Sequence, residues 1–353
     1  MPRIIVLGAS GALGREVTTV LGEYKFETDQ IKLFASSKSV GEEIDCGSDS
    51  LEVFPLERYD IKAGDFIFSC LPTSTAKELL PDFVAKGGTV LDVSGAFATL
   101  SELPVCLAEI NGDAIRQFKR ANKGKGSLLR VPCPAATALA LTVNPLQKLF
   151  PIRSITVTSL CSVAAWGRKA MDELWGQTTS LLQYGETEAV TLPGQLAFNC
   201  LTSIGEIDEK QNSSFENLVI GQLVQLIPGL KNCLSYSAAM IPVFSADTHS
   251  VTIDFETTTT TEIILSTLRE SPGIVLFDEV EPETKLSPLE AAFIDGVCVS
   301  RLRASNSTPI EGAAAQKSSN TASISLWAAS DALRRGSAIS AVHILEIYQE
   351  SEQ

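Results

Sequence analysis

A short apolar run, residues 3–7, leads directly into a turn in which glycine recurs at Gly8, Gly11 and Gly14. Such a run is typical of a buried parallel strand. Glycine permits a tight turn and lets the next helix pack close to the strand, and unpaired N–H groups at the helix start can hold a pyrophosphate. The spacing is Gly-x-x-Gly-x-x-Gly rather than Gly-x-Gly-x-x-Gly, but its place in the first strand–turn–helix favours a dinucleotide site. The expected contacts are Gly8, Ser10, Gly11, Ala12, Leu13 and Gly14.

The next apolar run, residues 31–35, ends in Ser37, Lys38 and Ser39. A protein that binds NAD usually carries an acidic residue near this point, which accepts a hydrogen bond from the ribose 2′-hydroxyl. Two hydroxyls and a lysine suit a 2′-phosphate instead, although an ordinary polar turn has the same composition. We therefore expect these three residues to bind the cofactor, with NADP favoured over NAD.

The first part of the chain alternates apolar runs with helical segments. Runs at 65–70 and 89–93 flank a helix that extends to Lys86. This alternation predicts an α/β fold with a Rossmann-like, doubly wound parallel sheet.

After residue 133 the pattern changes. A strand is expected at 154–160 and a long helix from about 166 to 184, and residues 240–244 and 250–255 alternate apolar with polar side chains. Such alternation is typical of an antiparallel or mixed sheet that is covered on one face, hence of an α+β second domain. Residues 304–322 predict a mobile loop, and a last helix is expected from about 331 to 350.

Cys133 lies between these two parts, where an extended segment gives way to an apolar helical run at 138–150. Unpaired N–H groups and the helix dipole lower the pKa of a thiol at a helix N-terminus. Cys133 is therefore a candidate nucleophile. The alternative is a small buried apolar residue, as most of the eight cysteines must be.

Composition excludes several classes of protein. The formal net charge of −14 argues against nucleic acid or an anionic membrane as partners. No apolar run reaches the roughly 18 residues that span a bilayer, and no signal peptide is recognisable, so a cytoplasmic protein is expected. The cysteines form no Cys-x-x-Cys pair and there are only two histidines, so no metal site is expected.

The order of motifs along nearly the whole chain resembles that of the aspartate-semialdehyde dehydrogenase superfamily. The matching segments are Gly8 to Gly14, Ala35 to Gly41, Asp92 to Phe97, Glu109 to Asn111, Pro132-Cys133, Gln195 to Asn199, Ile241 to Val243, and Trp327 through Asp331 to Gly336. The resemblance implies a nucleotide-binding domain at 1–132 completed by a C-terminal helix at 330–353. It also implies an α+β substrate and dimerisation domain of the semialdehyde dehydrogenase type at 133–329, and a homodimer built on its sheet.

The family reaction belongs to amino-acid biosynthesis and interconverts an acyl phosphate and an aldehyde with NADP. A cysteine thiolate attacks the aldehyde, hydride leaves to the nicotinamide, and phosphate then cleaves the thioester. The resemblance implies a cysteine nucleophile and a histidine base. The candidates here are Cys133 and His249.

Several positions depart from the family pattern when the motifs are carried over without gaps. Pro134 takes the place of the nucleophile, with Cys133 one position earlier, and Asp247 takes the place of the base, with His249 two positions later. The other departures are Ala98 for a phosphate-binding arginine, Cys161 for a glutamine, Leu218 and Gln222 for a lysine and a glutamate, Met240 for a substrate arginine, and Ala332 for an asparagine.

Two functions remain open. In the first, which we favour, the chain is similar to the dehydrogenase-like paralogue that bacteria carry beside the true enzyme. It would then be a homodimer that binds NAD(P), has degraded catalytic and substrate-binding residues and does not process aspartate semialdehyde efficiently. In the second, it is an active NADP-dependent oxidoreductase that uses Cys133 on an aldehyde without a carboxylate. The missing arginines favour the first, or an uncharged substrate.

Overall fold

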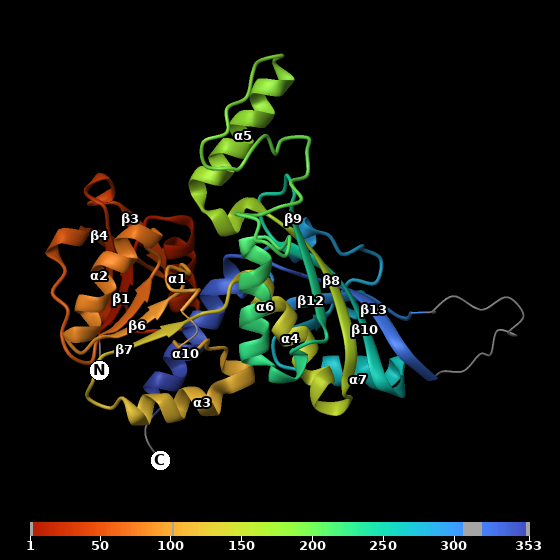
Figure 1. Ribbon diagram of the computed structural model, residues 1–353. Coiled ribbons are helices and arrows are strands. Elements are labelled where there is room, and N and C mark those ends of the chain that lie inside the picture. Colours follow the sequence, from red (N-terminus) through yellow and green to blue (C-terminus); the bar gives the residue numbers. More distant parts are fainter. Residues whose placement is uncertain (1–2, 101, 306–319, 351–353) are drawn as a thin grey trace, which may run out of the picture. The chain divides into compact units, whose positions relative to one another are not determined.

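The computed structural model describes residues 3–100, 102–305 and 320–350. The chain divides into two compact units (Figure 1). The first unit contains the chain up to Cys133 and again from Leu333 onward, and the second contains Pro134–Ala332. The segment that follows the second unit thus returns to the first.

The first unit is built on a sheet that, within the described residues, has seven strands in the order β3-β4-β2-β1-β5-β6-β7. All neighbours are parallel except the antiparallel pair of β3 and β4. The four residues of β1 and of β5 are all buried, as expected for strands covered on both faces. The strands are β1 (Ile4–Leu7), β2 (Ile31–Ala35), β3 (Glu43–Cys46), β4 (Asp49–Pro55), β5 (Phe66–Ser69), β6 (Thr89–Asp92) and β7 (Ser127–Arg130).

Helices cover this sheet. They are α1 (Ala12–Glu23), α2 (Thr73–Ala85), α3 (Ala108–Ala121), the π-helix η6 (Arg334–Ile339) and α10 (Ser340–Gln349). Helices α1, α3 and α10 pack beside one another, and α10 contributes Val342, Ile344 and Leu345 to the same buried cluster as Val17 of α1. The last segment of the chain is therefore part of the core of the first unit.

The second unit is built on a mixed sheet of six strands among the described residues, in the order β11-β12-β13-β10-β8-β9. Pairs β8/β9 and β11/β12 are parallel, and the pairs between them are antiparallel. The strands are β8 (Ile152–Cys161), β9 (Leu234–Met240), β10 (Asp247–Thr260), β11 (Ile274–Leu276), β12 (Val297–Ala304) and β13 (Asn320–Ser330).

The two faces of this sheet differ in burial. Along β8, Ile155, Val157 and Ser159 are buried while Thr156 and Thr158 are exposed. The strands are packed by the longer helices α4 (Pro134–Leu149), α6 (Ser214–Leu226) and α7 (Thr261–Arg269) and by the short helices α8 (Phe277–Val280) and α9 (Pro288–Ala291). Helix α5 (Arg168–Leu182) instead extends away from the sheet (Figure 1). One face is thus covered by the unit itself, and the other carries small polar side chains.

The predicted fold class is confirmed: a Rossmann-like parallel sheet precedes a mixed α+β unit. The strand predicted at 240–244 is wrong, because β9 ends at Met240 and Pro242 lacks the N–H group that a continuing strand would donate. The predicted helix at 331–350 begins only at Arg334, as a π-helix. Of the loop predicted at 304–322, residues 306–319 lie outside the described residues, and its ends belong to β12 and β13.

Candidate functional site

The glycine-rich turn between β1 and α1 has no room for side chains at two of its glycines. A Cβ atom at Gly8, where φ is +77°, would lie 2.6 Å from the carbonyl oxygen of Cys70, and one at Gly14 would lie 2.3 Å from that of Gly8. At Gly11 the nearest atom would be 3.3 Å away. Gly8 therefore permits the turn to approach the end of β5, and Gly14 permits α1 to pack against the turn.

The start of α1 is suited to an anion. Gly11, the N-cap residue, makes no side-chain capping bond, and the first turn of α1 contains no acidic residue. The N–H groups there are among those that helices leave unpaired, and they carry the positive end of the helix dipole. Gly8, Ser10, Gly11, Ala12, Leu13 and Gly14 thus form one turn that can hold a pyrophosphate.

The turn that follows β2 is joined to the glycine-rich turn. The backbone N–H groups of Gly8 and Ala9 donate to the carbonyl oxygen of Phe34, at 2.8 and 3.0 Å. Ser37, Lys38 and Ser39 form a short 3₁₀ turn just beyond it, and Ser37 and Lys38 are exposed. The two segments predicted to bind the cofactor therefore lie next to each other in the fold, as adjacent strand ends of a doubly wound sheet do.

Cys133 directly precedes α4, as the sequence predicts, and it is half-buried. Helix α4 reverses into β8 through only Phe150 and Pro151, so the two elements run antiparallel. Pro134, the first residue of α4, therefore lies at the same end of the second unit as Cys161, the last residue of β8. Cys133 closes the first unit and His249 belongs to the second.

His249 is a fully buried residue near the start of β10, one of the two central strands of the second sheet. Its Nδ1 lies 2.8 Å from Oγ of Ser159, which pairs with it on β8. Burial lowers the pKa of His249 to about 4. The imidazole is therefore neutral at physiological pH and held by one hydrogen bond to a neighbouring strand.

At one end of the second sheet, the four neighbouring strands β13, β10, β8 and β9 each contribute one side chain to a row that runs across the strands. Asp247 pairs with Ser330, Cys161 pairs with Met240, and Thr248 pairs with Leu160, so that Asp247 and Cys161 are neighbours across β10 and β8. All four residues of the row are buried. Residues directly opposite in a sheet share a face, so the row Ser330–Asp247–Cys161–Met240 lies on the helix-covered side. Three of these positions are ones at which the resemblance expects a substrate-binding or catalytic group.

Asp247 is the charged member of this row. Its Oδ1 accepts hydrogen bonds from the backbone N–H and from Oγ of Ser162, at 2.8 and 2.9 Å. Burial, together with the negative charge of Asp331, raises the pKa of Asp247 to about 6, although the two bonds from Ser162 oppose the rise. A carboxyl group with such a pKa changes its charge near neutrality.

Asp92 and Arg130 order the loop that precedes α3. The carboxylate of Asp92, at the end of β6, accepts from the backbone N–H groups of Ala96 and Phe97. The guanidinium of Arg130, at the end of β7, donates to the carbonyl oxygens of Ala98 and Leu103. Ala98 is the position at which the resemblance expects a phosphate-binding arginine. It is thus fixed through its backbone carbonyl oxygen, which accepts from Arg130.

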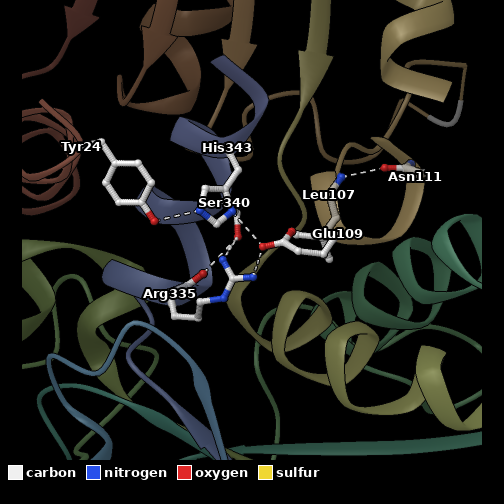
Figure 2. Close-up of polar contacts among 7 residues, drawn as sticks. All are labelled: Tyr24, Leu107, Glu109, Asn111, Arg335, Ser340 and His343. Carbon is white, nitrogen blue, oxygen red and sulfur yellow. Dashed lines mark hydrogen bonds and ion pairs between the residues drawn. The ribbon is translucent and has the colours of Figure 1, made fainter. Parts of the chain in front are cut away.

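A polar cluster within the first unit joins α3 to the C-terminal segment (Figure 2). Glu109 Oε1 accepts from Arg335 Nη2 at 2.5 Å and lies 2.8 Å from Nδ1 of His343, whose Nε2 lies 2.8 Å from the hydroxyl of Tyr24. Despite burial, these partners lower the pKa of Glu109 to about 2. Asn111 caps the same helix start, with its side chain bonded to Leu107 and Val105.

Sequence reasoning assigns no role to this cluster. Glu109 to Asn111 and the segment ending at Gly336 serve only as marks of the resemblance, because nothing in their spacing shows that they meet. The one signal in the sequence that could have suggested this cluster is that two of the matching segments carry opposite charges, Glu109 in one and Arg335 in the other.

Among the described residues, no group of three or more His, Cys, Asp and Glu is placed to hold a metal ion. In the same part of the chain, no helix combines the length and the apolar character needed to span a bilayer.

Comparison with known proteins agrees with the two-unit architecture. Residues 3–118 match the family described as semialdehyde dehydrogenase, NAD binding domain, and residues 143–334 match semialdehyde dehydrogenase, dimerisation domain. The aspartate-semialdehyde dehydrogenase of Rickettsia conorii is 29% identical over 343 residues, which cover 97% of this chain and 96% of the relative. The USG-1 protein homolog of Azotobacter vinelandii is 26% identical over 344 residues, covering 98% and 96%.

Solved structures share the fold over nearly the whole chain. Aspartate semialdehyde dehydrogenase II of Vibrio cholerae, complexed with ASA, has a TM-score of 0.86 at 24% identity and covers 98% of both chains. Aspartate semialdehyde dehydrogenase of Candida albicans with NADP has a TM-score of 0.69 at 17% identity and covers 98% of both chains. With both of its domains matched, the chain belongs to the semialdehyde dehydrogenase family and contains its NAD-binding and dimerisation domains.

Proposed function

We propose that this protein is a dehydrogenase-like homodimer that binds NAD(P) and does not turn over aspartate semialdehyde efficiently. The observation that carries the proposal is the row of Ser330, Asp247, Cys161 and Met240 at one end of the second sheet. There Cys161, Met240 and Asp247 present two uncharged side chains and one carboxyl group. A substrate carboxylate that loses its water there would find no cation among these three side chains, at a cost of several kcal/mol.

The environment of His249 supports the same proposal. A general base is most effective when its pKa lies near the working pH. Burial lowers the pKa of His249 to about 4, and its Nδ1 already contacts Ser159. His249 therefore suits a neutral core residue better than a proton acceptor during turnover.

We assign the cofactor role to residues 1–132 with 330–353, and NADP as the preferred cofactor. Lys38 and its two flanking serines offer a cation and two hydroxyl groups beside the glycine-rich turn. A 2′-phosphate would gain charge-assisted hydrogen bonds there. The related protein of Candida albicans is described with NADP, which is consistent with this assignment.

We assign residues 133–329 to ligand binding and to a homodimer. The exposed side chains of Thr156 and Thr158 mark the less buried face of the second sheet, and the match to a dimerisation domain supports its use by a second copy. We also place the protein in the cytoplasm, because none of its eight cysteines forms a disulfide.

One observation favours the second candidate function, an NADP-dependent oxidoreductase on an uncharged aldehyde. Cys133 is half-buried at a helix start, where a thiol gains nucleophilicity through the helix dipole. An aldehyde without a carboxylate would not need the missing arginines.

The deciding experiment measures phosphate-dependent NADPH formation with aspartate semialdehyde, for the wild type and for Cys133→Ala. The enzyme of Rickettsia conorii serves as the positive control. We expect no turnover above that of the variant, because poor positioning alone can cost orders of magnitude in rate. Turnover near that of the control, abolished by Cys133→Ala, would reject the proposal. Turnover of propanal but not of aspartate semialdehyde would establish the second candidate.

A further inference from the structure

Several buried polar atoms on the second sheet have no hydrogen-bond partner among the described residues. Two of them lie close to Asp247: Oγ of Ser330 on β13 and Nε2 of His249 on β10, in residues that are 1% and 0% exposed. An unsatisfied buried polar atom costs roughly 1–3 kcal/mol, so native proteins rarely leave one without an occupant.

Both atoms belong to side chains that surround Asp247. Ser330 pairs directly with Asp247, which places their side chains on one face with Cβ atoms roughly 5 Å apart. His249 follows two positions later on the same strand, so it shares that face as well. Three polar side chains from two neighbouring strands are therefore adjacent to one another on the helix-covered face.

Asp247 itself has an unused oxygen. Both side-chain bonds that it accepts, from N and Oγ of Ser162, end on Oδ1, and no described residue donates to Oδ2. The nearby charge that acts on Asp247 is the negative one of Asp331. The part of this face around Asp247 is thus rich in hydrogen-bond acceptors.

The two remaining members of the row provide no positive charge that could bind an anion. Cys161 and Met240 continue the row beyond Asp247, and neither carries a charge. A carboxylate or phosphate would face the carboxyl group of Asp247 and find no basic side chain in the row, which disfavours it strongly at a buried position.

We infer that Asp247, Ser330 and His249 form a subsite for a primary ammonium group, so that the ligand of the second unit is an amine without a neighbouring carboxylate. An ammonium group has three N–H donors. In the tautomer whose Nδ1–H donates to Ser159, Nε2 of His249 joins Asp247 Oδ2 and Ser330 Oγ as the third of three acceptors. The charge of the ammonium group also neutralises that of Asp247.

This inference deepens the proposed function, on which it rests, because it names the ligand class. It explains in one step why the arginine expected at Met240 and the histidine base expected at Asp247 are both replaced. A water molecule with fewer donors is the competing occupant, and it would confer no preference for amines.

The test measures binding of three small probes to the full-length protein by saturation-transfer NMR, with and without NADP. The probes are n-butylammonium, butyrate and 4-aminobutyrate, which carry the amine alone, the carboxylate alone and both. We expect n-butylammonium to bind at millimolar concentration, 4-aminobutyrate to bind more weakly, and butyrate not to bind. Absence of amine binding, or equal binding of butyrate, would overturn the inference in favour of a site filled by water.

Three variants locate the binding. Asp247→Asn keeps an oxygen for the two bonds from Ser162 and should weaken n-butylammonium binding by at least roughly tenfold, because it removes the charge. Ser330→Ala should weaken it several-fold. Asp254→Asn, further along β10 and bonded to Ser154, is the matched control and should bind the amine as the wild type does.

Circular dichroism of each variant separates lost binding from lost folding. Unchanged amine binding by folded Asp247→Asn would refute the subsite. The measurement requires no turnover, so it fails or succeeds independently of the aspartate-semialdehyde assay, and efficient turnover in that assay would reject the proposed function instead.

Discussion

Arg335 and Glu109 form a buried ion pair that fastens the C-terminal segment to α3, with Arg335 Nη2 2.5 Å from Glu109 Oε1. The side chains are 1% and 9% exposed, so water screens the pair little. Removing one partner of such a pair leaves the other charge buried and uncompensated.

Glu109→Gln should therefore destabilise the protein by about 3–5 kcal/mol, measured by urea unfolding at neutral pH. The matched control is Glu350→Gln, which removes the exposed pair between Arg116 of α3 and the end of the C-terminal segment. That control should cost less than about 1 kcal/mol. Equal effects of the two substitutions would contradict the importance assigned to the buried pair.

The same pair gives a pH dependence. Because the folded pKa of Glu109 is lowered to about 2, its contribution is complete above the unfolded value of about 4.5 and is lost as pH falls from there toward 2. Glu109→Gln should lack this part of the acid sensitivity.

Asp247→Asn should change how stability depends on pH. The folded pKa of Asp247 is raised to about 6, so its contribution is present at low pH and is lost as pH rises from about 4 to 6. The folded pKa of His249 is lowered to about 4, so its contribution is present above its unfolded value of about 6.5 and is lost as pH falls toward 4. The two effects oppose each other in the wild type.

In Asp247→Asn, the pH dependence of stability that arises from His249 should no longer be opposed by that of the Asp247 carboxyl group. The stability of Asp247→Asn should rise by about 3 kcal/mol more than that of the wild type between pH 4 and pH 6.5, in urea titrations at several pH values. Asp254→Asn is the control. Hydrogen bonds lower the pKa of Asp254, so this substitution should change the dependence of stability on pH in the opposite direction. Parallel pH profiles for the wild type and Asp247→Asn would show that Asp247 does not titrate as described.

Gly14→Ala should abolish cofactor binding and destabilise the first unit by about 1–3 kcal/mol. The new methyl group would meet backbone atoms of Gly8 and Ala9 at 2.3 and 2.6 Å, which cannot move away as a flexible side chain could. Gly11→Ala, whose nearest contact would be 3.3 Å, should be tolerated far better. Calorimetric titration with NADP and thermal unfolding measure both effects, and a tolerated Gly14→Ala would refute the close packing.

Lys38→Ala should weaken NADP binding by roughly tenfold and leave NAD binding unchanged. The loss corresponds to one charge-assisted hydrogen bond of about 1.5 kcal/mol, at the lower end of the range because Lys38 is exposed and screened. Lys32→Ala, which removes an exposed lysine of the preceding strand β2, is the control. If the wild type binds NAD as tightly as NADP in fluorescence titrations, the preference for NADP is wrong.

Thr158→Arg should convert the homodimer to a monomer at micromolar concentration. Thr158 is an exposed residue of the sheet face that we assign to the second copy, and an arginine there would be buried without a partner on association. Ile263→Arg, on exposed α7 surface, adds the same charge and should leave the dimer intact. Light scattering of the wild type as a monomer would reject the assembly itself.

Local patterns in the sequence predict much of the fold. The run at 31–35 coincides with β2, because its apolar residues end abruptly in a polar turn. Strand ends are less predictable, since they depend on partners far along the chain, and β8 extends beyond the predicted 154–160 to Ile152 and Cys161. The alternation of Leu234, Tyr236 and Ala238 with small polar residues goes unpredicted, because its serines are equally common in turns.

The candidate site is less accessible to sequence reasoning than the fold. The glycine-rich turn is contiguous, so its spacing alone reveals it. The row of Ser330, Asp247, Cys161 and Met240 depends instead on the register of four strands, which no local pattern specifies. Asp247 stands out in the sequence only through a residue-by-residue resemblance, and Ser330 does not stand out at all.

The return of the C-terminal segment to the first unit bears on the order in which the protein can mature on the ribosome. Domains usually fold in turn as they emerge. Here the buried cluster around Val17 lacks Val342, Ile344 and Leu345 until the whole second unit has been synthesised. A nascent chain that has passed Cys133 therefore exposes an apolar face on its first unit while nearly two hundred more residues are translated. The core of the first unit is therefore complete only after the last segment of the chain has been synthesised.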